Sequence, residues 1–324
     1  MTSVVKLQEL IENEISKLTF GDHPRELYEP ISYILSLGGK RMRPLLVLLG
    51  YSIYKDNPKD IVRPALATEV FHNFTLMHDD IMDQAPLRRG KPTVHEKWDQ
   101  TVAILSGDTM LVKAYELFLD LEKSLIPPII SLFNKTAVEV CEGQQIDMNF
   151  ESREEVKEEE YMEMIRLKTA VLLGFSLQAG GLMAQADTRD QQLLYDIGEC
   201  MGVGFQLMDD LLDVYGDQDK FGKKVGGDIV ANKKTYLLIK AMELAKGKNK
   251  IDLLSLISKD DADESEKVQS VKKIYDELGI RKLTTHAMNS YFDKAFTLIE
   301  KLDGSDESKK VLLQFSRHLM KRES

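Results

Sequence analysis

Cysteine, proline, glycine and long apolar runs are all scarce in this sequence of 324 residues. Its two cysteines, Cys141 and Cys200, are too few for a disulfide scaffold and are typical of a reducing compartment. Both lie in apolar helical patterns, so we predict that both thiols are buried. The nine prolines and 20 glycines leave few breaks, and the alternation typical of strands is nearly absent. These scarcities favour a protein built from long helices.

The chain also lacks an apolar run long enough for a membrane. The longest candidate, residues 170–186, is interrupted by polar residues and falls short of the ~20 predominantly apolar residues that a span requires. We predict a buried core helix there and no membrane span. The N-terminus is amphipathic and acidic and has no apolar segment like that of a signal peptide, which predicts a cytoplasmic location.

A general excess of positive charge is missing as well. The 43 Lys and Arg residues face 53 Asp and Glu residues, and the formal net charge is −10. This balance disfavours sequence-independent binding of nucleic acid and adsorption to an anionic membrane. Helical periodicity predicts one all-α bundle, a single domain over residues 1–324, with helices near 3–18, 24–37, 44–55, 59–84, 98–121, 127–150, 158–166, 169–186, 188–216, 234–246, 263–278, 281–302 and 306–322.

One aspartate-rich motif occurs twice in the sequence. HDDIMD at 78–83 returns as MDDLLD at 208–213, each at the end of a predicted helix. Asp79 and Asp83 are four residues apart and share a helix face, and Asp209 and Asp213 repeat this spacing. Like charges on one face repel each other, and a helix C-terminus disfavours negative charge. A bound divalent cation offsets both costs, and carboxylate ligands with open positions suit Mg²⁺ bound together with phosphates. A solvated acidic face is the alternative, but the apolar segment 203–208 before the second motif argues against it.

Basic residues gather near these motifs. Three cations follow a glycine pair in GGKRMRP at 38–44, just before a predicted helix, and a helix N-terminus favours phosphate. RRGKP at 88–92 follows the first motif, two lysine pairs follow the second, and Lys168 begins another predicted helix. His72 shares the face of Asp79 and is either a core residue or a phosphate donor. Each basic group taken alone also fits solvated surface, but carboxylates, Mg²⁺ and cations together bind polyphosphates.

The motifs appear in an order that resembles the trans-isoprenyl diphosphate synthases (polyprenyl synthetases) of the short-chain type, which make geranylgeranyl or farnesyl diphosphate. The resemblance covers nearly the whole chain and is carried by GGKRMRP, EVFHNFTLMHDDIMD, LRRGKPT, LSGDTML, GQQIDM, LKTA, FQLMDDLLD, FGKKVGGDI and NKKTY. It implies an all-α, terpenoid-synthase-type helical bundle around a central cavity. It also implies a homodimer, with the two aspartate motifs facing each other across that cavity.

The resemblance implies a Mg²⁺-dependent prenyltransferase that condenses isopentenyl diphosphate head-to-tail (1'-4) with allylic diphosphates. Three Mg²⁺ ions grip the allylic diphosphate, its C–O bond ionises, the double bond of isopentenyl diphosphate attacks the cation, and pyrophosphate removes a proton. This chemistry needs no protein nucleophile, and none of the usual nucleophile motifs occurs in the sequence.

The resemblance also assigns roles to residues at matching positions. The direct Mg²⁺ ligands are Asp79, Asp83 and Asp209, supported by Asp80, Asp210 and Asp213. The isopentenyl diphosphate site comprises Gly39, Lys40, Arg43, His72 and Arg89. The allylic diphosphate site comprises Arg88, Lys168, Thr169, Gln206, Lys223 and Lys233, where Lys233 is preferred to Lys234. Three C-terminal cations are expected to help close the site: Arg317, Lys321 and Arg322.

Product length is expected to depend on the residues before the first motif. Phe74 and Thr75 are the fifth and fourth residues upstream of Asp79. By family analogy an aromatic residue followed by a small one implies a C20 product, geranylgeranyl diphosphate, with the C15 farnesyl diphosphate as the alternative. Wheel geometry places Thr75 directly beneath Asp79 and leaves plain core packing open for Phe74. Two other functions stay open: a class I terpene cyclase and a non-catalytic regulatory subunit.

Overall fold

The computed structural model describes residues 3–216, 225–258 and 263–320, and its only strands form one short hairpin. The prediction of an all-α protein is confirmed. The chain divides into two compact units. Unit 1 comprises residues 1–135, 175–195 and 302–312, and unit 2 comprises residues 136–174, 196–301 and 313–324. The prediction of a single domain over residues 1–324 stays a prediction.

Unit 1 contains the elements α1 (Val4–Ile15), α2 (Arg25–Ser36), α3 (Met42–Ser52), η1 (Pro58–Ile61), α4 (Val62–Met82), β1 (Leu87–Arg88), β2 (Lys91–Pro92), α5 (Val94–Lys97) and α6 (Gln100–Phe118). Unit 2 contains α8 (Glu158–Ile165), η2 (Arg166–Ala170), α12 (Gly227–Val230), α13 (Tyr236–Leu244), α14 (Gly247–Ser258), α15 (Glu264–Glu277) and α16 (Ile280–Glu300). Four helices contribute residues to both units: α7 (Ile126–Glu151), α9 (Val171–Met183), α10 (Thr188–Tyr215) and α17 (Asp306–Met320).

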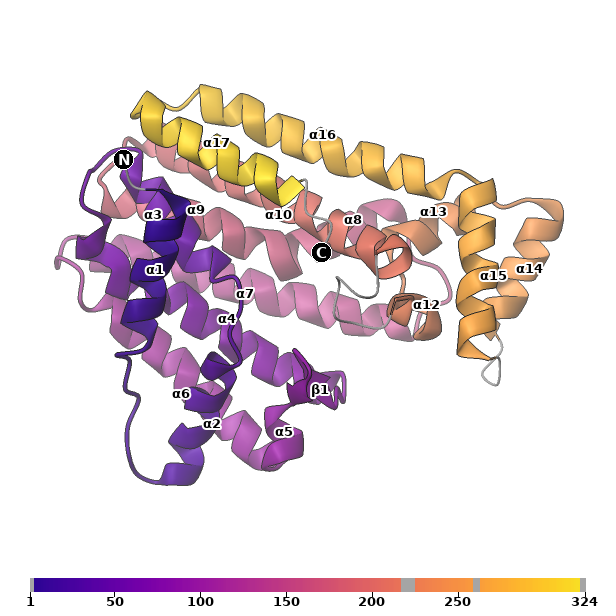
Figure 1. The fold of residues 1–324 in the computed structure, drawn as a ribbon, viewed down its shortest axis with the longest axis horizontal. Helices are drawn as coiled ribbons and strands as arrows, with labels where there is room; N and C mark the ends of the chain where they lie inside the picture. The colour runs from indigo at the N-terminus through magenta and orange to yellow at the C-terminus, as the bar shows by residue number, and fades with distance from the viewer. Residues whose placement is uncertain (1–2, 217–224, 259–262, 321–324) are drawn as a thin grey trace. The chain divides into compact units, whose positions relative to one another are not determined.

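Helix α4 forms the centre of unit 1. It packs against α3 and runs alongside α6 (Figure 1). Apolar residues surround the N-terminal part of α4, so most of its side chains there are buried. The ring of Phe133 on α7 contacts those of Phe71, Phe118 and Phe175 at centroid distances of 5.0, 5.2 and 5.7 Å. This packing fixes the helix that carries the first aspartate motif.

Unit 2 has its own apolar core, which holds α12, α13, α14 and α15 together. Leu237, Leu253 and Tyr275 are almost fully buried in it. In Figure 1, α14 and α15 lie side by side, and α12 lies against α15. The helix α14 is absent from the helices predicted above, because its sequence is mostly polar. It forms where Leu253 packs into this core.

Two further expectations need correction. Cys200 is buried, as predicted, but Cys141 is exposed because it lies on the outer side of α7. The predicted break between helices near residue 168 is also wrong. Residues 166–170 form a π-helical turn, η2, that joins α8 directly to α9. The amide of Val171 bonds to the carbonyl of Arg166, which widens the helix there. In the described part of the chain, none of the helices is both long and apolar enough to span a membrane.

Candidate active site

The first aspartate motif lies in the last turn of α4. The helix ends at Met82, and Gln84 adopts the left-handed conformation with φ of 50°. The amide of Gln84 bonds to the carbonyl of Ile81, and the amide of Ala85 bonds to that of Asp80. This Schellman arrangement satisfies the last carbonyls of the helix. It fixes the motif at a helix C-terminus, as predicted.

A hairpin with a two-residue loop follows, and it contains Arg88 and Arg89. Its loop residues Arg89 and Gly90 have φ of 53° and 73°, the signature of a type I' turn. From β1, the Nε and Nη2 atoms of Arg88 donate hydrogen bonds of 2.7 to 2.9 Å to the carboxylate of Asp80. Burial raises the pKa of Asp80, and Arg88 opposes that shift. Arg88 therefore compensates the one first-motif carboxylate that is almost fully buried.

Arg89 reaches from the hairpin to the glycine pair before α3. Its Nη1 donates a hydrogen bond to the carbonyl of Gly38. Gly39 has φ of 137°, and a Cβ atom there would lie 2.8 Å from Nη2 of Arg89. A side chain at position 39 would displace the guanidinium of Arg89, so this position requires glycine.

Positive charge converges around His72. Burial and the neighbouring arginines, above all Arg43 and Arg89, hold the pKa of His72 well below its usual value, so this histidine is neutral at pH 7. Burial lowers the pKa of Arg43 to about 10, and Arg89 adds to the shift. The Nε atom of Arg43 is buried and has no hydrogen-bond partner within the described residues. A buried donor in a cluster of like charges favours a bound anion.

One of the three cations in GGKRMRP, Arg41, was given no role of its own from the sequence. Arg41 adopts a left-handed conformation (φ 46°) at the start of α3, and its guanidinium is buried. It bonds to Glu69 at 2.8 Å, to the carbonyl of Leu35 at 2.7 Å and to Glu12 at 3.1 Å. The available signal was Glu69, a carboxylate in the mainly apolar N-terminal part of α4.

In unit 2, α10 carries the second motif, and Asp210 is its buried member. The hydroxyl of Tyr161 donates to Asp210 at 2.5 Å, and the amide nitrogen of Gln206 donates at 3.2 Å. Burial, followed by the nearby charge of Asp228, raises the pKa of Asp210 to about 7. Asp209 and Asp213 are less buried. Tyr161 was not identified from the sequence.

The π-helical turn η2 brings two predicted residues to the same network. The hydroxyl of Thr169 donates to Gln206 Oε1 at 3.3 Å, and Lys168 Nζ bonds to Asp147 Oδ2 at 2.6 Å. A Cβ atom on Gly143 would lie 2.2 Å from the backbone nitrogen of Lys168, so α7 packs directly against the turn. A π-helical turn is a frequent device at functional sites.

The short helix α12 connects the second motif to the predicted lysine. Asp228 N donates to Asp213 Oδ2 at 3.1 Å, and Lys233 N donates to the Asp228 carbonyl at 2.9 Å. The side chain of Lys233 is exposed. Arg317 lies over the ring of Phe296, 5.6 Å from its centroid. Three predicted cations lie outside the described residues: Lys223, Lys321 and Arg322.

Among the described residues, no group of three or more Asp, Glu, His or Cys side chains forms a ready metal site. Each motif instead offers carboxylates one helical turn apart, Asp79 with Asp83 and Asp209 with Asp213. Such a donor set fits Mg²⁺, which keeps waters and binds through one or two carboxylates together with substrate phosphates.

The two residues predicted to set product length lie on α4. The ring of Phe74 contacts those of Phe71 and His78 at centroid distances of 5.6 and 4.8 Å. The hydroxyl of Thr75 donates to the carbonyl of His72 at 2.8 Å. The bulk of Phe74 therefore lies in an aromatic row along α4.

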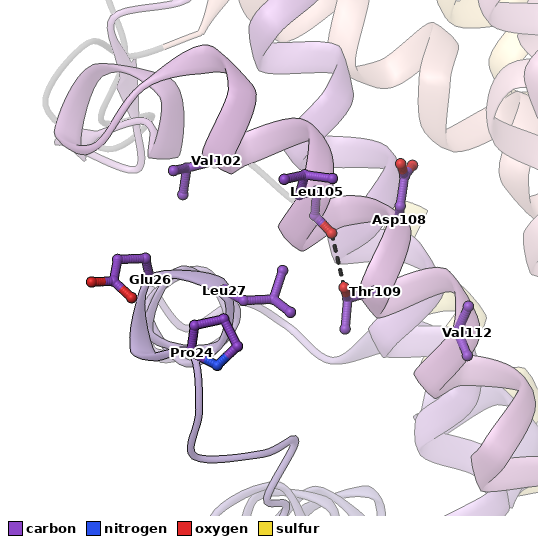
Figure 2. A pocket seen from close by; sticks show the side chains of 8 residues that line it. All are labelled: Pro24, Glu26, Leu27, Val102, Leu105, Asp108, Thr109 and Val112. Atoms are coloured by element: carbon purple, nitrogen blue, oxygen red, sulfur yellow. Dashed lines mark hydrogen bonds between the residues drawn. The ribbon is translucent and has the colours of Figure 1, made fainter.

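A cavity of about 420 Å³ lies elsewhere in unit 1, between the start of α2 and α6 (Figure 2). Figure 2 shows Leu27 directed toward α6, with Val102, Leu105 and Val112 along the facing helix. None of the predicted site residues lines this groove.

Comparison with known proteins gives a consistent result. Residues 24–278 match a model of the family described as Polyprenyl synthetase. The geranylgeranyl diphosphate synthase of Methanosarcina mazei is 35% identical over 97% of this chain and 95% of its own. The farnesyl diphosphate synthase of Bacillus subtilis is 38% identical over 74% of this chain and 83% of its own. A crystal structure of a geranylgeranyl pyrophosphate synthase is 47% identical, with a TM-score of 0.95 and full coverage of both chains.

Proposed function

The chain belongs to the polyprenyl synthetase family, and we propose that it condenses isopentenyl diphosphate head-to-tail (1'-4) with allylic diphosphates to give geranylgeranyl diphosphate. It is a trans-prenyltransferase with the all-α terpenoid-synthase fold. Membership of the family implies isoprenoid diphosphate substrates and a divalent metal ion. The cytoplasmic location predicted from the sequence belongs to this proposal as well.

The metal in this proposal is Mg²⁺, in three ions that arrive with the diphosphate. Asp79, Asp83 and Asp209 hold the ions, while Asp80, Asp210 and Asp213 support the ligands. When bound, Mg²⁺ stabilises the negative charge that develops on the diphosphate leaving group. The spacing of the carboxylates supports this assignment, since Asp79 and Asp83, and likewise Asp209 and Asp213, lie one helical turn apart.

The arginine cluster of unit 1 supports an isopentenyl diphosphate site. Its members in this proposal are Gly39, Lys40, Arg43, His72 and Arg89. The unpartnered Nε of Arg43 donates to a phosphate oxygen, and Arg89 passes close over Gly39 because no side chain blocks it. His72 is neutral and so offers one N–H donor without a further charge.

The network around η2 supports an allylic diphosphate site. Its members in this proposal are Arg88, Lys168, Thr169, Gln206, Lys223 and Lys233. The cations bind the diphosphate, and the oxygens of Thr169 and Gln206 stabilise the allylic cation. The C1–O bond of the allylic substrate breaks, C1 bonds to C4 of isopentenyl diphosphate, and the C2 proton leaves to pyrophosphate. The fixed hydrogen bonds from Thr169 to Gln206 and from Gln206 to Asp210 support this preorganisation.

The observation that carries the proposal is the convergence of Arg43, Arg88 and Arg89 beside the first aspartate motif. The test is incubation of the purified chain with Mg²⁺, isopentenyl diphosphate and each of the C5, C10 and C15 allylic diphosphates. We expect a C20 diphosphate as the main product, identified by mass spectrometry. A C15 end product would instead establish the farnesyl diphosphate alternative.

The two remaining alternatives give other results in the same assay. A terpene cyclase releases hydrocarbon from a single diphosphate without isopentenyl diphosphate. A non-catalytic regulatory subunit yields no product by itself. All six motif aspartates are present in this sequence, which favours an active synthase over a subunit that has lost them.

Replacing Phe74 by alanine is expected to lengthen the product beyond C20. The ring of Phe74 fills the aromatic row between Phe71 and His78, and its removal opens space along α4 for further isoprene units. Product sizing by mass spectrometry checks this, with Phe71→Leu as the control for altered aromatic packing. An unchanged product from an active Phe74→Ala variant would rule out Phe74 as the limit.

An apolar stripe on α6 supports the proposed homodimer. Leu105 and Val112 of α6 and Leu119, the C-cap residue that follows it, lie seven residues apart, with 54%, 58% and 62% of their surface exposed. Apolar residues at heptad spacing form the contact line of paired helices. The groove of Figure 2 borders this line. A second copy of the chain covers the stripe in this proposal, because the same face on both copies makes a closed two-fold contact.

The double substitution Leu105→Glu and Val112→Glu is expected to raise the dimer dissociation constant at least about 100-fold, because buried unpaired carboxylates oppose association. Sedimentation velocity measures the change. Ile251→Glu on α14 is the matched control, since Ile251 is equally apolar and 68% exposed but lies off the stripe. A wild-type chain that sediments as a monomer would contradict the proposal.

A further inference from the structure

The helix α12 has only four residues, Gly227–Val230, yet it links the second aspartate motif to Lys233. A helix this short is not stable alone, because the first turn costs more conformational entropy than its bonds return. Its position therefore depends on its neighbours. On one side, Asp213 of α10 holds its start. The amide of Gly226 bonds to the Asp213 carbonyl at 2.6 Å, and the amide of Asp228 bonds to Asp213 Oδ2 at 3.1 Å.

On the other side, α15 contacts α12 at both of its ends. Gly226 has φ of 86°, and a Cβ atom there would lie 2.6 Å from the side chain of Val268. One residue before Val268, the ammonium of Lys267 donates to the carbonyl of Val230 at 3.3 Å. The last carbonyls of a helix have no partner within it, and lysine is a common donor to them.

Lys267 is unusual because it is a buried lysine, with 5% of its surface exposed. Burying an ammonium group is costly unless it is paired and hydrogen-bonded. It lines a small cavity together with Asp210, Asp228 and Lys233. The cation therefore lies among residues of the second motif and the diphosphate site rather than in a purely apolar core.

We propose that Lys267 is a positioning residue, which sets the place of Asp213 and Lys233 by fixing α12 at its C-terminal end. The amide of Lys233 bonds to the Asp228 carbonyl at 2.9 Å, so a displaced α12 also displaces Lys233. The inference rests on the proposed function, in which both residues serve the allylic diphosphate. It assigns a role to a side chain that itself contacts neither reacting atoms nor substrate.

The test compares Lys267→Met with Lys267→Arg, which keeps a donor, and with Lys273→Met, an exposed lysine on the same helix. For Lys267→Met we expect the KM for the allylic diphosphate to rise about tenfold, with the KM for isopentenyl diphosphate unchanged. In Lys267→Arg we expect the KM for the allylic diphosphate to stay close to the wild-type value, because the arginine keeps a donor. In Lys273→Met we expect both KM values to be unchanged. Lys267→Gln takes the place of Lys267→Met if the methionine variant does not fold.

Hydrogen–deuterium exchange without substrate gives a readout independent of turnover. In Lys267→Met the amides of residues 226–231 are expected to exchange faster, while those of α13 and α16 keep their wild-type rates. A variant in which both KM values are unchanged, or rise alike, overturns the proposal, even if it is less stable. An inactive wild-type chain refutes the proposed function, whereas an active one with an unaffected Lys267 variant refutes only this inference.

Discussion

Replacement of Asp79 or of Asp209 by alanine is expected to lower kcat at least about 10³-fold, while the chain keeps its fold. The physical reason is the charge that develops on the diphosphate when its C–O bond breaks. Each of these carboxylates is proposed to hold Mg²⁺ against that charge. Steady-state kinetics across a range of Mg²⁺ concentrations measures the loss.

The matched control for this prediction is Asp56→Ala. Asp56 is an exposed aspartate in a loop of unit 1, and its removal is expected to leave kcat within about twofold, as for most surface substitutions. Circular dichroism verifies that all three variants stay helical. Rates near the wild-type value for Asp79→Ala or Asp209→Ala would refute the metal assignment for that motif.

Removal of Glu69 is expected to give the largest loss of stability. The side chains of Arg41 and Glu69 are 4% and 3% exposed and 2.8 Å apart. Glu69→Leu leaves the guanidinium of Arg41 buried without its main counter-charge, which costs about 3 to 5 kcal/mol of unfolding free energy. Urea unfolding followed by circular dichroism measures this value.

Two further variants test whether the loss of unfolding free energy comes from burying an unpaired charge. The double variant Arg41→Met with Glu69→Leu replaces the whole pair by apolar side chains and is expected to recover at least about half of the loss. Glu12→Leu removes the other carboxylate that contacts Arg41. Since that side chain is 53% exposed, we expect a cost below about 1 kcal/mol. Equal losses for Glu12→Leu and Glu69→Leu would show that burial of the pair is not the cause.

Most of the fold could be predicted because long helices carry a strong periodic signal. The helix that carries the first motif is mainly apolar in its N-terminal part, and its end at Met82 lies close to the predicted end at residue 84. Short elements were missed. The hairpin of Leu87–Pro92 depends on two positive φ angles at Arg89 and Gly90, and α14 depends on packing around Leu253. Neither feature leaves a periodic pattern.

The candidate site divides in the same way. The motif aspartates and the nearby cations were evident from spacing and charge, since carboxylates one turn apart repel each other unless something binds there. The residues that hold them were not evident. Tyr161 lies 49 residues from Asp210, which it bonds, and Lys267 lies 37 residues from the carbonyl it caps. Nothing local in the sequence marks such partners.

The sequence by itself determined the all-α class, the polyprenyl synthetase family and the chemical types of the site residues. These properties follow from periodicity and from short motifs, in which neighbouring residues act together. Only the tertiary structure decided which charge meets which: Arg88 with Asp80, Arg41 with Glu69, and a π-helical turn instead of a helix break at Lys168. Pairing and burial depend on contacts between distant segments, and the free energy of a charge depends on its partner and its exposure to water.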